Sequence, residues 1–229
     1  MPFVTVLQPD PEVPIERFGV WLPTFGVQFR TVPLWHTPLP RLADVGDGIL
    51  MLGGRMSAHH DSAWIAPIGD LLRQAVEGAV PVLAICLGHQ ILAEVFGGEV
   101  HVDDPLGGEE GPVDITFTPA ARADTVLGPL ARRVGPESVT LYESHHDAVV
   151  RLPDGAVPLA HSEKYPHQAF RLGSAVGVQF HPEASPELVA TWKSADGGDP
   201  TAVLRRMREV DRAVAHSARL IAQGFAAQL

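Results

Sequence analysis

Residues 81–90 read Pro-Val-Leu-Ala-Ile-Cys-Leu-Gly-His-Gln. The apolar run over 80–85 is typical of a strand buried on both faces of a parallel sheet. Residues 88–96 have the pattern of a helix, so Cys86 stands where a buried strand turns directly into a helix. This is the shape of a nucleophile elbow, which lifts its side chain above the carboxyl edge of the sheet. Ligands of open α/β sheets bind at that edge.

The flanking segments extend this pattern in both directions. Apolar, β-branched runs over 3–7, 27–32 and 48–52 predict further strands, and helical spacing over 15–25 and 64–78 predicts helices between them. Such alternation predicts an α/β fold with a three-layer, open and mostly parallel sheet that carries helices on both faces. Between 99 and 180, short runs predict antiparallel additions; they cover 113–117, 138–142, 157–161, 168–171 and 175–180.

The C-terminal part returns to helical signals. Ser185-Pro186 and Asp199-Pro200 both resemble an N-cap followed by proline in the first turn. Apolar positions between 203 and 221 then predict an amphipathic helix that packs on the domain, with a docking surface for a partner as the alternative. We expect residues 1–229 to form a single domain, with 185–226 as a C-terminal helical extension.

Composition and net charge argue against some classes of partner and location. The chain has 229 residues, 45% of them hydrophobic, and its 17 basic and 27 acidic side chains give a net charge of −10. An acidic surface repels phosphate backbones, so we expect no nucleic-acid partner. No apolar run approaches the roughly 18 residues of a membrane span, and the start of the chain does not resemble a signal peptide. With its single cysteine, the chain is expected in the cytoplasm, away from membranes.

A second motif supplies what a nucleophilic thiol needs. The apolar run over 176–180 leads into His181-Pro182-Glu183. Side chains two residues apart on an extended segment point the same way, so Glu183 can orient the imidazole while His181 faces the thiol. Cys86 as a packed core cysteine, and His-Pro-Glu as a surface turn, are the structural alternatives for each motif taken alone.

Together the two motifs resemble a known family. Residues 85–90 (Ile-Cys-Leu-Gly-His-Gln) and 177–183 (Gly-Val-Gln-Phe-His-Pro-Glu) resemble the two signatures of class I (triad) glutamine amidotransferases. Weaker resemblances lie at 53–57 and 144–147. The resemblance covers about 3–192, is closest to stand-alone domains similar to the amidotransferase domain of GMP synthase, and implies the family's flavodoxin-like architecture.

The resemblance also implies roles. Cys86 would be the nucleophile, His181 the base and Glu183 its orienting acid. Further contacts follow by the same resemblance: backbone N–H groups of Gly54 and Leu87 in the oxyanion hole, and substrate contacts from Gly53, Gln90, Ser144 and His145. Two residues depart from the family pattern, since Ala84 and His146 stand where glycine is usual.

The implied reaction is hydrolysis of the glutamine side-chain amide through a γ-glutamyl thioester, without a metal or cofactor. Because the chain carries no synthetase signature, the ammonia would pass to a separate synthetase. A stand-alone γ-glutamyl peptidase or amide hydrolase is the first alternative, and an inactive regulatory or binding module is the second. A metal site at His59-His60-Asp61 or His145-His146-Asp147 is disfavoured, because adjacent side chains seldom reach the same ion.

Overall fold

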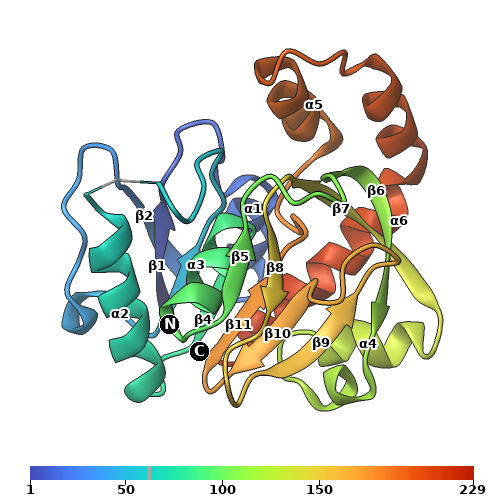
Figure 1. Ribbon diagram of the computed structural model, residues 1–229. Helices are drawn as coiled ribbons and strands as arrows, with labels where there is room; N and C mark the ends of the chain where they lie inside the picture. Colours follow the sequence, from blue (N-terminus) through green and yellow to red (C-terminus); the bar gives the residue numbers. More distant parts are fainter. Residues whose placement is uncertain (61–62) are drawn as a thin grey trace.

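A nine-stranded sheet forms the centre of the molecule, in the order β2-β1-β3-β4-β11-β10-β9-β6-β7 (Figure 1). The computed structural model describes residues 1–60 and 63–229. The first five strands of this order are β2 (Gln28–Pro33), β1 (Phe3–Gln8), β3 (Gly48–Met51), β4 (Val82–Ile85) and β11 (Ala175–Val178). All neighbours among them pair in parallel. The predicted α/β sheet is therefore confirmed.

Helices cover both faces of the parallel half because side chains alternate along its strands. One face packs against α2 (Ile65–Glu77) and α3 (Leu87–Val95), and the other against α1 (Glu16–Thr24) and α6 (Thr201–Ala226). In β4, Leu83 and Ile85 belong to the core beneath α1 and α6, whereas Val82 and Ala84 belong to the core beneath α2 and α3. These two apolar cores make the three layers.

The second half of the sheet is antiparallel. It contains β10 (Ala169–Leu172), β9 (Val157–His161), β6 (Glu109–Phe117) and β7 (Ser138–His145). Three elements here were not predicted from the sequence: α4 (Gly128–Val134) and a separate two-stranded sheet of β5 (Glu99–His101) and β8 (Ala148–Arg151). They are short and lack the periodicity that identifies longer elements.

The antiparallel half curls back towards the parallel half. The backbone N–H of His181, just after β11, donates to the carbonyl of Tyr142 in β7 at 2.8 Å. The thiol of Cys86, just after β4, donates to the carbonyl of Ser144 at 3.8 Å. Strand β7 is thus at the far end of the sheet in strand order, yet its last residues lie beside the ends of β4 and β11.

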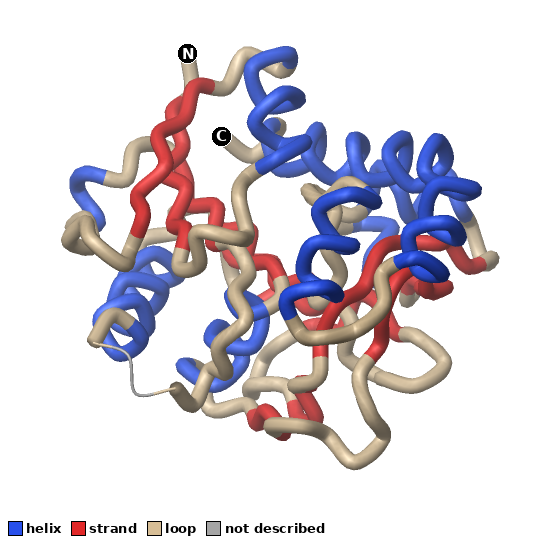
Figure 2. Tube along the Cα trace, turned by 90° about the horizontal axis from the view of Figure 1, so that it is seen from above, coloured by secondary structure: helices blue, strands red, loops and turns tan. Residues whose placement is uncertain are grey.

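The C-terminal helices pack on the domain as predicted, but α6 has Pro200 rather than Asp199 at its N-cap, and Asp199 instead accepts from the N–H of Thr201 at 2.9 Å. Ser185 caps α5 (Pro186–Ala195), because its hydroxyl oxygen accepts from the N–H of Leu188 at 3.2 Å. Helix α6 crosses behind β6 and β7 with Val203, Met207 and Val214 buried (Figures 1 and 2). Within the described residues, no helix combines the length and apolar character needed to cross a lipid bilayer.

Candidate active site

Cys86 occupies the sharp turn between β4 and α3. Its backbone has φ 51° and ψ −106°, a conformation that side-chain-bearing residues rarely adopt. Two hydrogen bonds hold it there: its N–H donates to Val178 in β11 at 2.8 Å, and its carbonyl accepts from the N–H of Gln90 at 3.0 Å. The turn leaves Cys86 6% exposed, at the carboxyl edge of the sheet.

His181 and Glu183 follow the neighbouring strand β11. Nδ1 of His181 lies 2.8 Å from Oε1 of Glu183, and both side chains are buried. The indole of Trp192, in α5, packs against the imidazole with ring centroids 4.7 Å apart. Because β4 and β11 pair in parallel, their ends bring the Cys and His-Pro-Glu motifs to one place.

The loop after β3 shows how close Cys86 and His181 lie. A Cβ placed on Gly53 would be 3.0 Å from Cε1 of His181 and 3.3 Å from Cβ of Cys86. Gly53 therefore lies against both side chains, and a Cβ there would require one of them to shift by a few tenths of an ångström. Glycine allows this close packing.

The electrostatics of His181 favour its protonated form. Burial alone lowers the pKa of this imidazole, but the charges of Glu183 and Cys86, and hydrogen bonds with both, outweigh it. The pKa of His181 is consequently raised well above its ordinary value. An imidazolium at this position is suited to pair with a thiolate.

The predicted oxyanion donors lie near this centre, in the loop after β3 and at the start of α3. Leu87 is the first residue of α3, and a Cβ on Gly54 would lie 3.0 Å from Cδ2 of Leu87. Neither backbone N–H has a hydrogen-bond partner within residues 1–60 and 63–229. Two free donors beside a cysteine at a helix N-terminus are the arrangement that binds an oxyanion.

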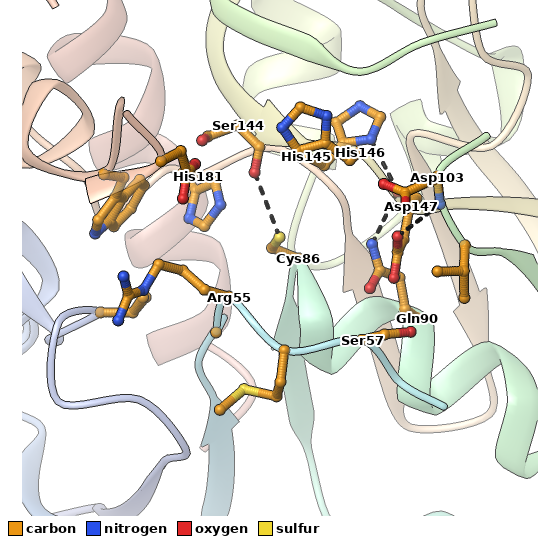
Figure 3. A pocket seen from close by; sticks show the side chains of 16 residues that line it. Arg55, Ser57, Cys86, Gln90, Asp103, Ser144, His145, His146, Asp147 and His181 are labelled. Carbon is orange, nitrogen blue, oxygen red and sulfur yellow. Dashed lines mark hydrogen bonds between the residues drawn. The ribbon is translucent and has the colours of Figure 1, made fainter. Parts of the chain in front are cut away.

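A cavity of about 280 Å³ opens over Cys86 (Figure 3). Its walls bring together several predicted site residues: Gly54, Cys86, Gln90, Ser144, His145 and His181. Gly53 and Leu87 lie behind this wall, buried next to the cysteine. Other residues of the two weaker motifs also line it: Arg55, Met56, Ser57, His146 and Asp147. The lining residues that sequence reasoning missed are Val13, Val102, Asp103, Trp192 and Asp196.

Gln179 is a further residue that the sequence analysis did not assign. Its Nε2 donates to Sγ of Cys86 at 3.4 Å, and its Oε1 accepts from Nε2 of Gln90 at 3.2 Å. Gln90 also donates to the carbonyl of Asp147 at 3.0 Å. An amide that donates to sulfur stabilises a thiolate. The available signal was its position, two residues before His181 in the second motif.

One histidine of each pair contacts protein groups through its ring. Nδ1 of His145 faces the carbonyl of Asp147 at 2.9 Å and its Nε2 faces Glu109 at 3.3 Å, so neither nitrogen is free. His59 pairs with Glu94, and Asp61 of the first run lies outside the described residues. No group of three potential ligands gathers among the residues that are described. His146 has an ordinary φ, so its departure from glycine causes no backbone strain.

With this geometry in view, the chain can be compared with known proteins. The family model described as glutamine amidotransferase class-I matches residues 22–191. The chain belongs to the class I glutamine amidotransferase family. The family resemblance inferred from the two motifs is therefore confirmed.

Relatives of the chain include a protein named as a peptidase and proteins named as synthase subunits. A γ-glutamyl peptidase 5 of Arabidopsis thaliana is 31% identical over 179 residues, which are 75% of this chain and 69% of the relative. A glutamine-hydrolysing GMP synthase subunit of Methanosarcina mazei is 35% identical over 65% of this chain and 71% of its own length. The chain is similar to both.

Solved structures give the same fold. A glutamine amidotransferase of Methylobacillus flagellatus superposes with a TM-score of 0.84 and 29% identity, covering 100% of this chain and 94% of that structure. A glutamine amidotransferase of Thermotoga maritima superposes with a TM-score of 0.83 at 22% identity, a likeness of fold alone. The likeness to the Methylobacillus flagellatus structure covers the whole chain, including α5 and α6.

Proposed function

We propose that this protein hydrolyses the side-chain amide of glutamine, or a γ-glutamyl amide, with Cys86, His181 and Glu183 as its catalytic triad. The observation that carries the proposal is the buried contact of Glu183 with His181 at 2.8 Å, beside a cysteine held in a strained turn. A structural cysteine requires neither a strained backbone nor an oriented imidazole.

The proposed reaction begins with the thiolate of Cys86 attacking the amide carbonyl carbon while His181 holds the thiol proton. The tetrahedral oxyanion accepts hydrogen bonds from the N–H groups of Leu87 and Gly54. His181 then gives its proton to the departing amine, and a γ-glutamyl thioester remains. Water, deprotonated by His181, attacks the thioester and releases glutamate. Glu183 keeps the imidazole in the required orientation and stabilises its positive charge.

The first candidate role is supply of ammonia to a separate synthetase, with this chain as the amidotransferase component. Its support is the likeness to proteins named as glutamine-hydrolysing subunits of GMP synthase. In this role the leaving group is ammonia, and the substrate is free glutamine.

The second candidate role is hydrolysis of larger γ-glutamyl amides by the chain alone. The cavity over Cys86 has a volume of about 280 Å³, close to the lower end of the roughly 300–1,000 Å³ range of small-ligand pockets. Its lining extends to Val13, Trp192 and Asp196, and the ring of Trp192 packs against His181. A relative named γ-glutamyl peptidase agrees with this role.

The test compares the wild-type chain with Cys86→Ser. Release of glutamate and of the amine is measured with glutamine and with a panel of γ-glutamyl peptides and amides. We expect Cys86→Ser to abolish release while circular dichroism and thermal unfolding stay close to wild type. A glutamine-analogue electrophile is expected to label wild type only. Near wild-type turnover by Cys86→Ser would refute the triad.

A further inference from the structure

Asp10 lies in the loop between β1 and α1, where its side chain is fixed by its own neighbours. It is 3% exposed. Its backbone carbonyl accepts from Nε2 of Gln8 at 3.0 Å and from the N–H of Val13 at 3.1 Å. Oδ1 of its carboxylate accepts from the N–H of Glu12 at 2.9 Å. The second oxygen, Oδ2, is consequently held in one direction, towards the loop after β3.

Arg55, in the loop after β3, donates two hydrogen bonds to this second oxygen of Asp10. Its backbone N–H donates to Oδ2 of Asp10 at 3.1 Å, and its Nε donates to the same oxygen at 3.2 Å. Nη1 of Arg55 also pairs with Oε2 of Glu12 at 3.1 Å. We name Asp10, Glu12 and Arg55 the loop clamp, because they join the loops that follow two adjacent parallel strands, β1 and β3.

The loop clamp fixes the peptide next to the proposed oxyanion donor. The N–H of Arg55 belongs to the Gly54–Arg55 peptide, so its bond to Asp10 sets the orientation of that peptide plane and restrains Gly54, whose own N–H lies in the preceding Gly53–Gly54 peptide. Hydrogen bonds to a charged group are stronger than neutral ones, which resists the peptide flip that glycine otherwise permits. Gly54 also lies between Asp10 and Leu87: a Cβ there would be 3.5 Å from Cβ of Asp10 and 3.0 Å from Cδ2 of Leu87.

Arg55 has a second effect at the site. A buried carboxylate close to the oxyanion hole would by itself oppose a developing negative charge. The guanidinium of Arg55 offsets the charge of Asp10, so the loop can be fixed by a strong acceptor without this penalty.

We propose that Asp10 is a positioning residue that keeps the Gly53–Gly54 loop in the orientation that completes the oxyanion hole, so that the chain is active without a partner protein. This inference rests on the proposed hydrolysis at Cys86. It favours the second candidate role, in which the chain acts alone.

The test uses Asp10→Asn, Arg55→Met and a matched control, Asp47→Asn. Asp47 also accepts a backbone N–H, that of Phe3 at 2.8 Å, but at the opposite end of β1. For each purified chain, kcat and KM are measured on the best γ-glutamyl substrate without a partner. The rate of Cys86 alkylation by iodoacetamide is measured in parallel, because that reaction forms no tetrahedral oxyanion.

We expect Asp10→Asn to lower kcat by about 10- to 100-fold, less than the roughly 100- to 1,000-fold loss of a whole oxyanion donor. Arg55→Met keeps its N–H bond to Asp10 and is expected to lower kcat several-fold. KM, alkylation rates and all values for Asp47→Asn are expected to stay close to wild type. If Asp10→Asn does not fold, as judged by circular dichroism, Asp10→Glu decides the question with the same expected loss of kcat, because it keeps the charge but displaces the carboxylate from the N–H of Arg55.

Unchanged kcat in Asp10→Asn, or in Asp10→Glu where that variant decides, would overturn the role of the loop clamp. A parallel fall of kcat and alkylation rate would also overturn it, because Asp10 would then support the cysteine itself. A wild-type chain that turns over neither glutamine nor any γ-glutamyl amide would instead refute the proposed function, and with it the inferred partner-free activity.

Discussion

The backbone of Cys86 is strained, and this residue is the proposed nucleophile. A non-glycine residue at φ 51° and ψ −106° is destabilised by about 1–3 kcal/mol, and the surrounding fold must offset this cost. The offset comes from Val178 and Gln90, whose backbone groups bond both sides of the cysteine. This backbone conformation places the thiol beyond the end of β4, next to the end of β11.

Glu183 permits a sharp test at the same scale. Its charge raises the pKa of His181, so the imidazolium persists to a pH above its ordinary range, and activity should fall as pH rises through this raised pKa. In Glu183→Gln the charge is gone, and the fall of kcat/KM should move to lower pH. We also expect kcat to drop by roughly 100- to 10,000-fold with KM little changed.

The control for this experiment is Glu187→Gln, which removes an exposed acid that pairs with Arg208 at 2.9 Å. Its pH–rate profile should match that of wild type. A Glu183→Gln profile with the same alkaline limb as wild type would remove Glu183 from the triad.

At the scale of elements, α5 matters because it carries Trp192 onto the imidazole of His181. The helix begins at a proline, which leaves one fewer N–H to satisfy, and Ser185 caps the N–H of Leu188. A local capping signal in the sequence therefore helps to place an aromatic ring at the site.

Ser185→Ala should destabilise the protein by about 1 kcal/mol through the lost cap. For a chain of this size that corresponds to a fall in Tm of roughly 2–4 °C. Ser194→Ala is the control, because Ser194 lies in the last turn of the same helix and donates only to the carbonyl of Ala190. Equal thermal stability of Ser185→Ala and Ser194→Ala would show that the cap contributes nothing measurable.

At the scale of the whole molecule, several elements together form the buried environment of Glu143. Where β7 curls back to the ends of β4 and β11, it buries Glu143 completely, and neither carboxyl oxygen has a hydrogen-bond partner among the residues that are described. His145, 3.9 Å away, is on the same strand; Glu109, His181 and Cys86 face Glu143 from other parts of the chain. Burial, with the charge of Glu109, raises the pKa of Glu143 well above its ordinary value.

This raised pKa makes stability depend on pH. Above the ordinary pKa of a glutamate, the unfolded chain releases the proton while the folded chain retains it, so stability falls as pH rises towards the folded-state pKa. Glu143→Gln cannot ionise and should lose this dependence. We expect its Tm, relative to wild type, to be higher at pH 8 than at pH 5.

Glu137→Gln serves as the control, because Glu137 is an exposed acid immediately before the same strand. Its Tm should follow wild type at both pH values. A Glu143→Gln shift of the same size at pH 5 and pH 8 would mean that Glu143 does not carry a raised pKa.

The sequence alone predicted the elements that are specified by adjacent residues. The parallel strands, the turn at Cys86 and the cap at Ser185 were predictable, because strand burial, elbow geometry and capping are each encoded within a few adjacent residues. The two motifs also indicated that Cys86, His181 and Glu183 would meet, since ends of parallel strands share one edge of a sheet.

Only the tertiary structure brought together residues whose partners lie far along the chain. Asp10 is separated from Arg55 by 45 positions, and Gln179 from Cys86 by 93. The short elements β5, β8 and α4 carry too little periodicity to be recognised alone, and contacts elsewhere in the fold stabilise them. The hydrogen bonds between loops and the burial of Glu143 depend on how the sheet curls to bring β7 beside the ends of β4 and β11. This curl depends on contacts between distant residues, so it cannot be predicted from any short stretch of sequence.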